Sequence, residues 1–542
     1  MENLAGLEFT QTERDTFLST LTVLKGRYDT LRTVDLPNSV PVPLYFDPRI
    51  PGQDIPKGRE KYLFQEFPTK RPKNIEECAF YTIGQLAHLI RTQQVTSLEL
   101  TTMYLDRLKR HGPTLECVVT LTEELALKQA RMADKNIQTG RYLGPLHGIP
   151  YGAKDLLATD GGIPTTWGAE PFRHQTFQYN ATVINKLCSS GAILVAKLAM
   201  IELAGGMGYR QPNASLTGPC KSPWGKNMWA GGSSSGSGSA VGTGLVPFAI
   251  GSETWGSILS PANNCGVSGL RPTFGRVSRY GAMALSWSLD KIGPLCLSAD
   301  DCGIVLNKIA GPDSKDPSSS DKLYEYSVDS SQRKFKLAVL ASASTNIDEE
   351  VAGNFEESLV TLSQFCEIEE INFPDYPYEA ITRTIMLAES GAIFEEFSNS
   401  GTAALLTAPE DKYGPYARTA VLAKDYLKAL RLRDEISQKI DPIMSKYDAV
   451  CGPTRGTPAS NLEDEFRGAI RGNARDTLGA LGNSIGLPAI SVPNGFTKAN
   501  LPTGIQFVGQ VYAENSVLSL ANRFQQQTDW HLKHPAELLE EN

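Results

Sequence analysis

The sequence predicts an α/β fold: a single large α/β/α sandwich whose mixed central sheet is covered by helices on both faces. Two observations carry this prediction. Helical and strand patterns alternate from about residue 76 onward, which is typical of sheets covered by helices. The chain of 542 residues is 41% hydrophobic and 21% charged, so it can bury a large core and is neither mainly disordered nor a coiled coil.

Residues 1–75 form an N-terminal extension in this interpretation, and residues 76–542 form the main domain. The extension holds a polar helical segment near 10–30 and then a Pro-rich run, LPNSVPVPLYFDPRIPGQDIP (36–56). Proline removes a backbone donor and clashes inside a helix, so this run cannot be helical. We expect it to wrap over another surface.

The main domain opens with clear helix signals. Thr96 and Glu99 form a capping-box pattern, and Gly140 ends the next expected helix. A helix that ends at Gly191 runs directly into the apolar run AILVAK, which predicts a helix followed by a strand. Helices are expected near 96–110, 122–139, 180–190, 348–365, 418–445 and 514–530, and strands near 192–197, 336–341, 367–372, 447–452, 488–493 and 504–509.

Charge and cysteine content exclude several classes of protein. Lys and Arg total 52 against 60 Asp and Glu, and the net charge of -8 gives no attraction to nucleic acid or to an anionic membrane. The nine cysteines are scattered, so we expect reduced thiols and no structural zinc. The N-terminus lacks a basic and apolar leader, and the nearly uncharged stretch 227–270 is too rich in Ser and Gly to span a membrane. The default expectation is therefore a cytoplasmic location.

The segment GGSSSGSGSAVGTGLVPFAIGSETWGSILSP (231–261) carries the first chemical signal. A flexible linker would be flanked by charged or Pro-rich sequence, whereas this segment continues into the apolar run LVPFAI. Ser and Gly embedded in apolar sequence indicate close-packed backbone in which buried hydroxyls need partners. A buried group of serines and backbone N–H groups is what acyl-transfer chemistry uses.

A serine nucleophile needs a base, and the six histidines all lie outside the Ser-rich segment. The alternative base is Lys154, in GPLHGIPYGAKDLL, because residues 142–153 contain no Asp, Glu, Lys or Arg. This apolar, Gly- and Pro-bounded setting predicts burial, which disfavours the ammonium form and lowers the pKa. A neutral lysine can accept a proton from serine.

These two segments resemble the amidase signature family. The resemblance rests on HGIPYGAKD, on the Ser-rich segment continued to GLRPTFGRVS, and on LDKIGPL (289–295). It extends to RMAD (131–134), GPT (452–454), SIGLPAISVPNGF (484–496) and QFVG (506–509), and so covers roughly residues 76–535.

The resemblance implies a Ser–cis-Ser–Lys triad that hydrolyses amides through an acyl-enzyme. Lys154 matches the family's lysine, Ser233 its bridging serine, and Ser257 its nucleophile, and the Gly232–Ser233 peptide is expected to be cis. No metal or organic cofactor is implied.

The oxyanion hole is expected from backbone N–H groups of the turn 254–257, that is from Thr254, Trp255 and Gly256 with the nucleophile. Ser234 is assigned a supporting role in this turn. Asp155, Asp290 and His147 are interpreted as structural residues.

Two positions depart from the family's pattern. Trp255 stands where a glycine is common and should narrow the site, and Leu259 stands where an arginine is common. We therefore expect a small-molecule substrate, a linear and neutral or apolar carboxamide, with esters and carbamates open to the same route. Neither nucleic acid nor a membrane is expected as a partner, and the oligomer considered is a homodimer.

Three alternatives stay open. The first is the glutaminase (A) subunit of a tRNA-dependent amidotransferase, from the same family, which would need partner subunits. The second is an α/β-hydrolase with Ser234 as nucleophile in G-x-S-x-G, although this motif needs a preceding strand and a later histidine. The third is an inactive binding protein that kept the fold.

Overall fold

The structure of the protein is a computed structural model that describes residues 8–31, 33, 38, 44–49, 67–329, 331, 333–413, 418, 420–465 and 476–535. Within these ranges, no helix combines the length and apolarity that crossing a membrane requires.

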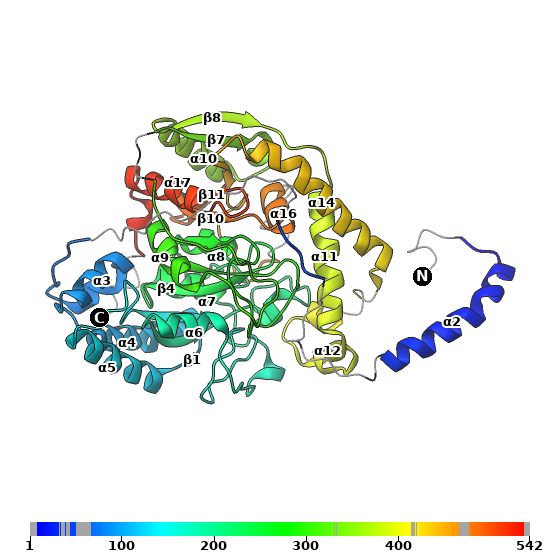
Figure 1. The fold of residues 1–542 in the computed structure, drawn as a ribbon, viewed down its shortest axis with the longest axis horizontal. Coiled ribbons are helices and arrows are strands. Elements are labelled where there is room, and N and C mark those ends of the chain that lie inside the picture. The colour runs from blue at the N-terminus through cyan, green and yellow to red at the C-terminus, as the bar shows by residue number, and fades with distance from the viewer. Residues whose placement is uncertain are drawn as a thin grey trace.

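One 11-stranded sheet runs through the molecule in the order β1-β3-β2-β4-β6-β5-β10-β11-β9-β7-β8 (Figure 1). Its pairs β2–β3, β2–β4, β7–β8 and β7–β9 are parallel and the others antiparallel, so the sheet is mixed as predicted. The strands are β1 (Val118–Leu121), β2 (Pro150–Lys154), β3 (Ile193–Leu198), β4 (Phe248–Glu253), β5 (Ser268–Arg271), β6 (Lys291–Cys296), β7 (Phe335–Leu340), β8 (Cys366–Ile371), β9 (Ala449–Pro453), β10 (Ala489–Phe496) and β11 (Pro502–Val508).

Helices cover the sheet on both faces, which confirms the predicted sandwich. The helices with described residues are α2 (Gln11–Leu31), α3 (Ile83–Arg91), α4 (Ser97–Leu115), α5 (Glu123–Gln138), α6 (Thr182–Ser189), α7 (Ser235–Gly242), α8 (Leu259–Cys265), α9 (Ala299–Ile309), α10 (Glu349–Ser363), α11 (Tyr378–Ile393), α12 (Glu395–Asn399), α13 (Pro409–Tyr413), α14 (Ala423–Met444), α16 (Thr477–Ser484) and α17 (Glu514–Gln527).

Two hydrophobic cores lie on opposite faces of the sheet. On β10, Ala489 packs into one core and its neighbour Ile490 into the other, because successive side chains of a strand point to opposite faces. Phe507 and Val508 of β11 divide in the same way. Helices α7 and α8 complete the core of Ala489, and α9 and α17 complete the core of Ile490.

The expected elements agree with the structure, with shifts at their ends. Thr96 caps α4 with Glu99 as predicted, but the helix runs on to Leu115. The helix expected from residue 418 begins at Ala423. Strands β4, β5 and β6 were not among the expected elements, because these buried, Gly-containing strands give no period-two pattern. The other elements that were not expected are β1, β2, α3, α7, α8, α9, α11, α12, α13 and α16.

The described part of the N-terminal region contacts the domain through residues 44–49. Phe46 packs on Phe274 with ring centroids 5.3 Å apart, and the Arg433 guanidinium lies 3.9 Å from the Phe46 ring centroid. Helix α2 lies apart from the sandwich in Figure 1. Most of the Pro-rich run lies outside the described residues, and the division into an extension and a domain stays a prediction.

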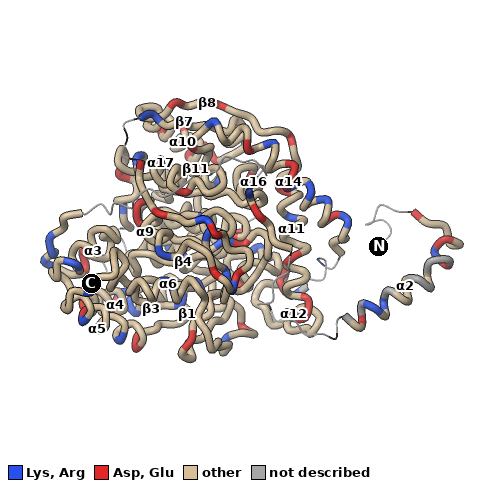
Figure 2. Tube along the Cα trace, viewed as in Figure 1, with Lys and Arg blue, Asp and Glu red and all other residues tan. Residues whose placement is uncertain are grey.

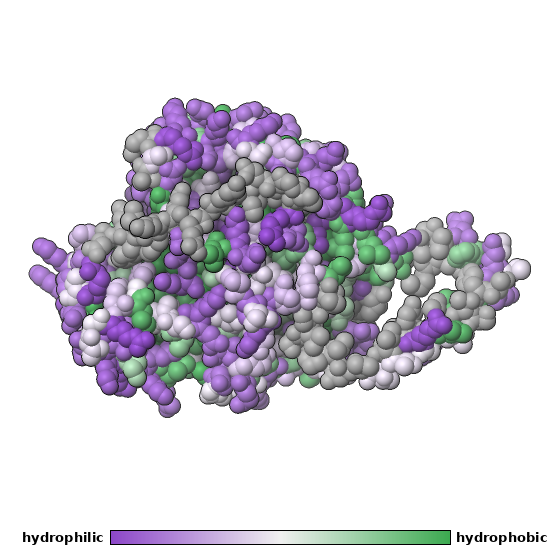
Figure 3. All heavy atoms as spheres, in the orientation of Figure 1, coloured by the Kyte–Doolittle hydropathy of each residue, from purple (hydrophilic) through white to green (hydrophobic). Residues whose placement is uncertain are grey.

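The surface carries both signs of charge. Figure 2 shows Lys, Arg, Asp and Glu interspersed over the outer elements. The face in Figure 3 is mostly hydrophilic, with scattered hydrophobic patches.

Candidate active site

The sheet brings the two chemically distinctive segments to one edge. β2 and β4 are parallel neighbours, with Gly152 opposite Ala249, so their carboxyl ends meet at the same edge. Lys154 is the last residue of β2, and the turn 254–257 directly follows β4. The turn before α7 supplies Ser233 and Ser234 from the start of the Ser-rich segment.

Lys154 is fully buried and touches two serines. Its Nζ lies 2.8 Å from Ser233 Oγ and 2.9 Å from Ser252 Oγ. Burial lowers its pKa to about 7, against the opposing influence of the Asp290 and Glu253 carboxylates. A substantial share of the side chain is therefore neutral near pH 7, as the sequence predicts.

The turn that holds Ser233 is also as predicted, because the Gly232–Ser233 peptide is cis. Ser234 ties this turn to both neighbouring segments. Its backbone N–H donates to the Ser257 carbonyl at 3.2 Å, and its hydroxyl donates to the Ser252 carbonyl at 3.1 Å. These contacts fit the supporting role expected for Ser234.

Ser257 lies in a tightly held turn. Gly256 adopts a φ of 82°, which favours glycine, and the carbonyl of Ser257 accepts the Ser234 N–H at 3.2 Å. Thr254 donates its hydroxyl to Asp290 Oδ1 at 2.6 Å. Within the described part of the chain, the Ser257 hydroxyl makes no hydrogen bond, so it is available to a substrate.

Glu253 is a site residue that sequence reasoning missed. Its buried carboxylate accepts the backbone N–H groups of Ile258 and Leu259 at 2.8 and 3.1 Å, directly after Ser257. Arg271 pairs with it at 2.9 Å. Burial alone would raise the Glu253 pKa, but Arg271 and Lys291 outweigh burial and lower it to about 2. The available signal was its position as the one charge in residues 227–270.

Asp155, Asp290 and His147, which are interpreted as structural from the sequence, each hold neighbouring backbone through hydrogen bonds. Asp155 pairs with buried Lys197 at 3.0 Å and accepts the Thr166 N–H. Asp290 accepts the N–H groups of Leu285 and Ser286 and so holds the loop before β6. The ring of His147 accepts the Leu143 N–H at 3.0 Å.

Trp255 is clamped beside the nucleophile. Its indole N–H donates to Asp476 Oδ2 at 2.8 Å, and the Arg383 guanidinium lies 4.7 Å from its ring centroid. The indole therefore forms a fixed wall, in agreement with the expected narrowing of the site.

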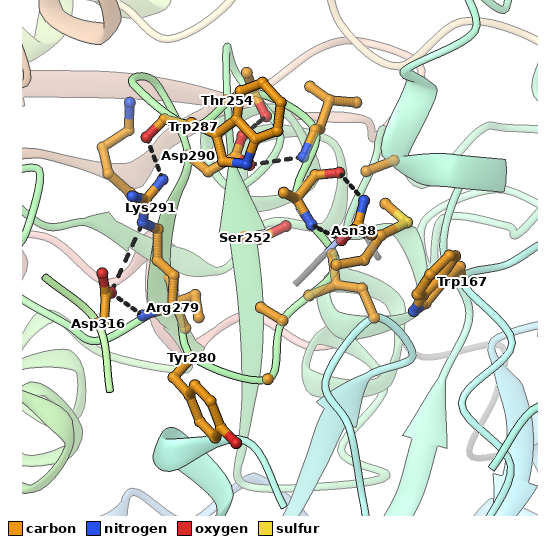
Figure 4. Close-up of a pocket in the computed structure, with 18 of the residues that line it drawn as sticks. Asn38, Trp167, Ser252, Thr254, Arg279, Tyr280, Trp287, Asp290, Lys291 and Asp316 are labelled. Atoms are coloured by element: carbon orange, nitrogen blue, oxygen red, sulfur yellow. Dashed lines mark hydrogen bonds and ion pairs between the residues drawn. The ribbon is translucent and has the colours of Figure 1, made fainter. Parts of the chain in front are cut away.

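Two hollows meet at this edge of the sheet. The nucleophile cleft, of about 410 Å³, is lined by Gly232, Thr254, Trp255 and Ser257. It also carries three arginines and one glutamate: Arg210, Arg383, Arg418 and Glu410. Thr254, Ala204 and Leu285 are shared with a second hollow of about 340 Å³ (Figure 4).

The α/β-hydrolase alternative does not fit this geometry. Ser234 is fully buried, and its hydroxyl accepts the Ser252 N–H while donating to the Ser252 carbonyl. No strand directly precedes it in this described region. His534 stacks on Phe80, with ring centroids 3.9 Å apart, and is occupied there.

The large mixed sheet places a buried lysine with a lowered pKa against a serine turn. This arrangement of fold and site is that of an enzyme of the amidohydrolase class. The chain belongs to the Amidase family, whose model matches residues 99–518. This confirms the resemblance inferred from the motifs.

Relatives and solved structures add detail. The chain is 33% identical to the A subunit of glutamyl-tRNA(Gln) amidotransferase from Nitrosococcus oceani, over 84% of this chain and 99% of that protein. It is similar to peptide amidase from Stenotrophomonas maltophilia (TM-score 0.71, 26% identity, 84% and 98% of the two chains). It is also similar to a chain from a vestigial protein complex that is described as revealing the origins of an s-triazine catabolic enzyme (TM-score 0.76, 25% identity, 82% and 98% of the two chains).

These findings correct one expectation and reverse one ranking. The sequence led us to expect a small-molecule substrate and, as the oligomer, at most a homodimer. This expectation is wrong because it included no other protein as a partner, whereas the curated relatives are components of an amidotransferase. The same relatives favour the alternative of an amidotransferase component over the free-standing amidase that the sequence motifs placed first.

Proposed function

We propose that this chain hydrolyses the C–N bond of a carboxamide through an acyl-enzyme on Ser257, with Ser233 as the bridging residue and Lys154 as the base. The observation that carries this proposal is the 2.8 Å contact between Lys154 Nζ and Ser233 Oγ, made by a lysine whose pKa burial lowers to about 7.

The proton path balances over one turnover. Neutral Lys154 takes a proton from Ser233 as Ser233 takes one from Ser257, and Ser257 Oγ attacks the carbonyl carbon. When the C–N bond breaks, Ser233 gives its proton to the leaving nitrogen and Lys154 returns one to Ser233. In the second half of the turnover, water attacks the acyl-enzyme in the place of Ser257 and loses a proton through Ser233. That proton ends on the Ser257 oxygen when the acyl group leaves.

The turn 254–257 would stabilise the tetrahedral intermediate through its backbone N–H groups. Glu253 supports this assignment, because its two hydrogen bonds hold the chain just beyond Ser257. Removal of one oxyanion donor typically raises the barrier by about 2.7–4 kcal/mol, so the position of this turn matters for the rate.

The cleft lining revises the expected substrate. Arg210, Arg383 and Arg418 line the cleft beside one carboxylate, Glu410. Arg210 is also paired with Glu465 at 3.4 Å, so guanidinium groups outnumber carboxylates at this wall. A positive cleft raises the local concentration of anions. We therefore propose an acyl half that carries a carboxylate, in place of the neutral or apolar amide expected from the sequence.

The chain is proposed to act as the glutaminase-type subunit of an amidotransferase, in contact with other protein subunits. The support is its likeness to curated amidotransferase components over 98–99% of their length, together with the positive cleft. A cytoplasmic location is proposed with it, since all nine cysteines are unpaired, as in reducing compartments.

A free-standing amidase is the second candidate. It is favoured by Trp255, which is fixed in the cleft by Asp476, and by Leu259 in place of a further arginine. The purified chain would then hydrolyse amides at full rate without a partner.

Fluorophosphonate labelling with peptide mapping tests the proposed nucleophile. We expect an adduct on Ser257 that Ser257→Ala and Lys154→Ala remove, while Ser363→Ala, a control at an exposed serine at the end of α10, keeps it. An adduct on Ser234 would refute the triad.

Hydrolysis of L-glutamine then separates the two candidates. Stimulation of at least tenfold when the chain is co-purified with its native partners supports the amidotransferase component. An unchanged rate, with full hydrolysis of an amidated dipeptide by the chain alone, supports the free-standing amidase.

A further inference from the structure

Lys154 has a second hydroxyl partner that the proposed proton path does not use. Its Nζ lies 2.9 Å from Ser252 Oγ, almost as close as the 2.8 Å to Ser233 Oγ. Ser252 is on β4 and Ser233 lies in the turn before α7, so the two hydroxyls reach the amine from different elements. Ser252 lines the second hollow, where Figure 4 shows it at the centre, whereas Ser257 lines the nucleophile cleft. Ser252 can therefore act on the base from the side away from the acyl group.

The number of bonds that an amine can make gives this second contact a meaning. An ammonium group has three N–H donors and no acceptor. A neutral amine has two N–H donors and one lone pair, and only the lone pair can take a proton. Lys154 can accept the Ser233 proton only when its lone pair faces Ser233 Oγ. An N–H of the same amine can then point to Ser252 Oγ. Among the described residues, these two hydroxyls are the hydrogen-bond partners of Lys154 Nζ.

The charged groups near Lys154 do not orient its amine. Asp290 and Glu253 act on Lys154 through their charge, and both raise its pKa against the effect of burial. The Asp290 carboxylate accepts the Thr254 hydroxyl and two backbone N–H groups. The Glu253 carboxylate accepts two backbone N–H groups and the Arg271 guanidinium. The direction of the lone pair therefore depends on the two hydroxyls.

The backbone of Ser252 is held in place beside the base. Ser234 Oγ accepts the Ser252 N–H at 3.2 Å and donates to the Ser252 carbonyl at 3.1 Å. On its other side, Ser252 pairs with Ile292 of β6 in the antiparallel ladder. The Ser234 N–H also donates to the Ser257 carbonyl at 3.2 Å. Ser234 thus fixes the position of Ser252 relative to the turn of the nucleophile.

We propose that Ser252 is a positioning residue for the base: it accepts one N–H of neutral Lys154 and so turns the lone pair toward Ser233. This inference rests on the proposed function. Ser252 neither gains nor loses a proton, so the proton path over one turnover still balances. When Lys154 becomes an ammonium, its hydrogen bond to Ser252 becomes charge-assisted, and such bonds are roughly twice as strong as neutral ones. Ser252 therefore stabilises the protonated base more than the neutral base.

Ser252→Ala removes the acceptor, and Ser252→Thr is the matched variant that keeps a hydroxyl. The assay is hydrolysis of L-glutamine from pH 5 to 9, with the native partners present if the chain needs them for activity. In Ser252→Ala we expect the plateau kcat to fall at least tenfold and KM to change less than twofold, because the nucleophile cleft is untouched. The rising limb should also move to lower pH by about half a unit or more, because the ammonium form loses a charge-assisted bond. Ser252→Thr should keep both the plateau and the limb close to those of the unmodified protein.

Ser252→Cys keeps the test valid if the alanine variant does not fold. A thiol has nearly the shape of the hydroxyl but is a weak acceptor, so this variant should show the same two changes.

A purely structural role for Ser252 would give a different result. Loss of a hydroxyl that only supports packing would lower Tm or kcat without moving the rising limb. Ser491→Ala is the control for this case, because Ser491 is a buried strand serine whose hydroxyl lies 2.7 Å from Thr454 Oγ1. Its limb should stay in place. An unmoved limb in Ser252→Ala and Ser252→Cys, a limb that moves to higher pH, or an equal loss in Ser252→Thr would overturn the proposal.

The two proposals fail differently. If the unmodified protein shows no rising limb near pH 7, or no fluorophosphonate adduct on Ser257, the proposed function is rejected. If it shows both and the Ser252 variants leave the limb in place, this inference alone is rejected.

Discussion

The titration of Lys154 offers the sharpest test of the proposed mechanism. Burial lowers its pKa from 10.5 to about 7, and the Asp290 and Glu253 carboxylates oppose that shift. If the neutral amine is the base, kcat/KM should rise with pH and reach half its maximum near pH 7. About a tenth of the maximum is expected at pH 6, one unit below that pKa.

Asp290→Asn provides the shift that identifies the titrating group. Loss of this carboxylate removes an influence that raises the Lys154 pKa, so the rising limb should move to lower pH. Asparagine keeps an oxygen that can accept the Leu285 or Ser286 N–H, which limits damage to the loop.

The assay is kcat/KM for L-γ-glutamyl methylamide from pH 5 to 9, with thermal unfolding of each variant at every pH as the control. Full activity at pH 5 would refute the neutral-lysine mechanism, and so would a limb that moves to higher pH in Asp290→Asn.

Three further predictions concern stability and specificity. Between about pH 7 and 10.5 the unfolded chain holds a proton on Lys154 that the folded chain lacks, because the pKa is lowered in the fold. Lys154 therefore destabilises the fold at pH 7 by an amount on the order of 4 kcal/mol. Lys154→Met should raise Tm while abolishing hydrolysis, and a lower Tm would contradict this. Glu253→Gln leaves Arg271 buried without its counter-charge and should lower the free energy of unfolding by about 3–5 kcal/mol in urea titration, with an unchanged midpoint counting against it. Trp255→Gly should open the cleft and admit bulkier acyl groups, which would be measured as a rise in kcat/KM for branched over linear amides. Trp255→Phe keeps an aromatic ring but loses the indole N–H that bonds Asp476, and it should keep the original order.

The motifs near the nucleophile predicted a protein without partner subunits. The comparison with relatives corrected that prediction. The departures at Trp255 and Leu259, together with the N-terminal extension, argued for a free-standing enzyme. Leu259 replaces an arginine expected for a charged substrate, and Trp255 narrows the site. Arginines from elsewhere in the chain line the cleft, namely Arg383 on α11 and Arg418 farther along the chain. A motif around Ser257 cannot reveal these arginines, because Arg383 and Arg418 are more than a hundred positions from Ser257 in the sequence.

The sequence alone predicted the fold class and about half of the helices and strands. These features are local: a capping box or an amphipathic period contains its own physical cause within a few residues. Lys154 could be singled out from its apolar, Gly- and Pro-bounded surroundings, whereas Ser233 and Ser257 were assigned through the resemblance to the amidase signature family. The 2.8 Å contact between Lys154 and Ser233 and the cis peptide at Gly232–Ser233 agree with these assignments.

Only the tertiary structure decided what surrounds them. Distant segments bring Ser252 beside Lys154, Asp476 onto the Trp255 indole and Asn38 against Ala284. Trp255 and Asp476 are 221 positions apart, and Asn38 and Ala284 are 246 apart. Sheet pairing and helix packing set such contacts, and neither leaves a periodic signal at the residues that meet.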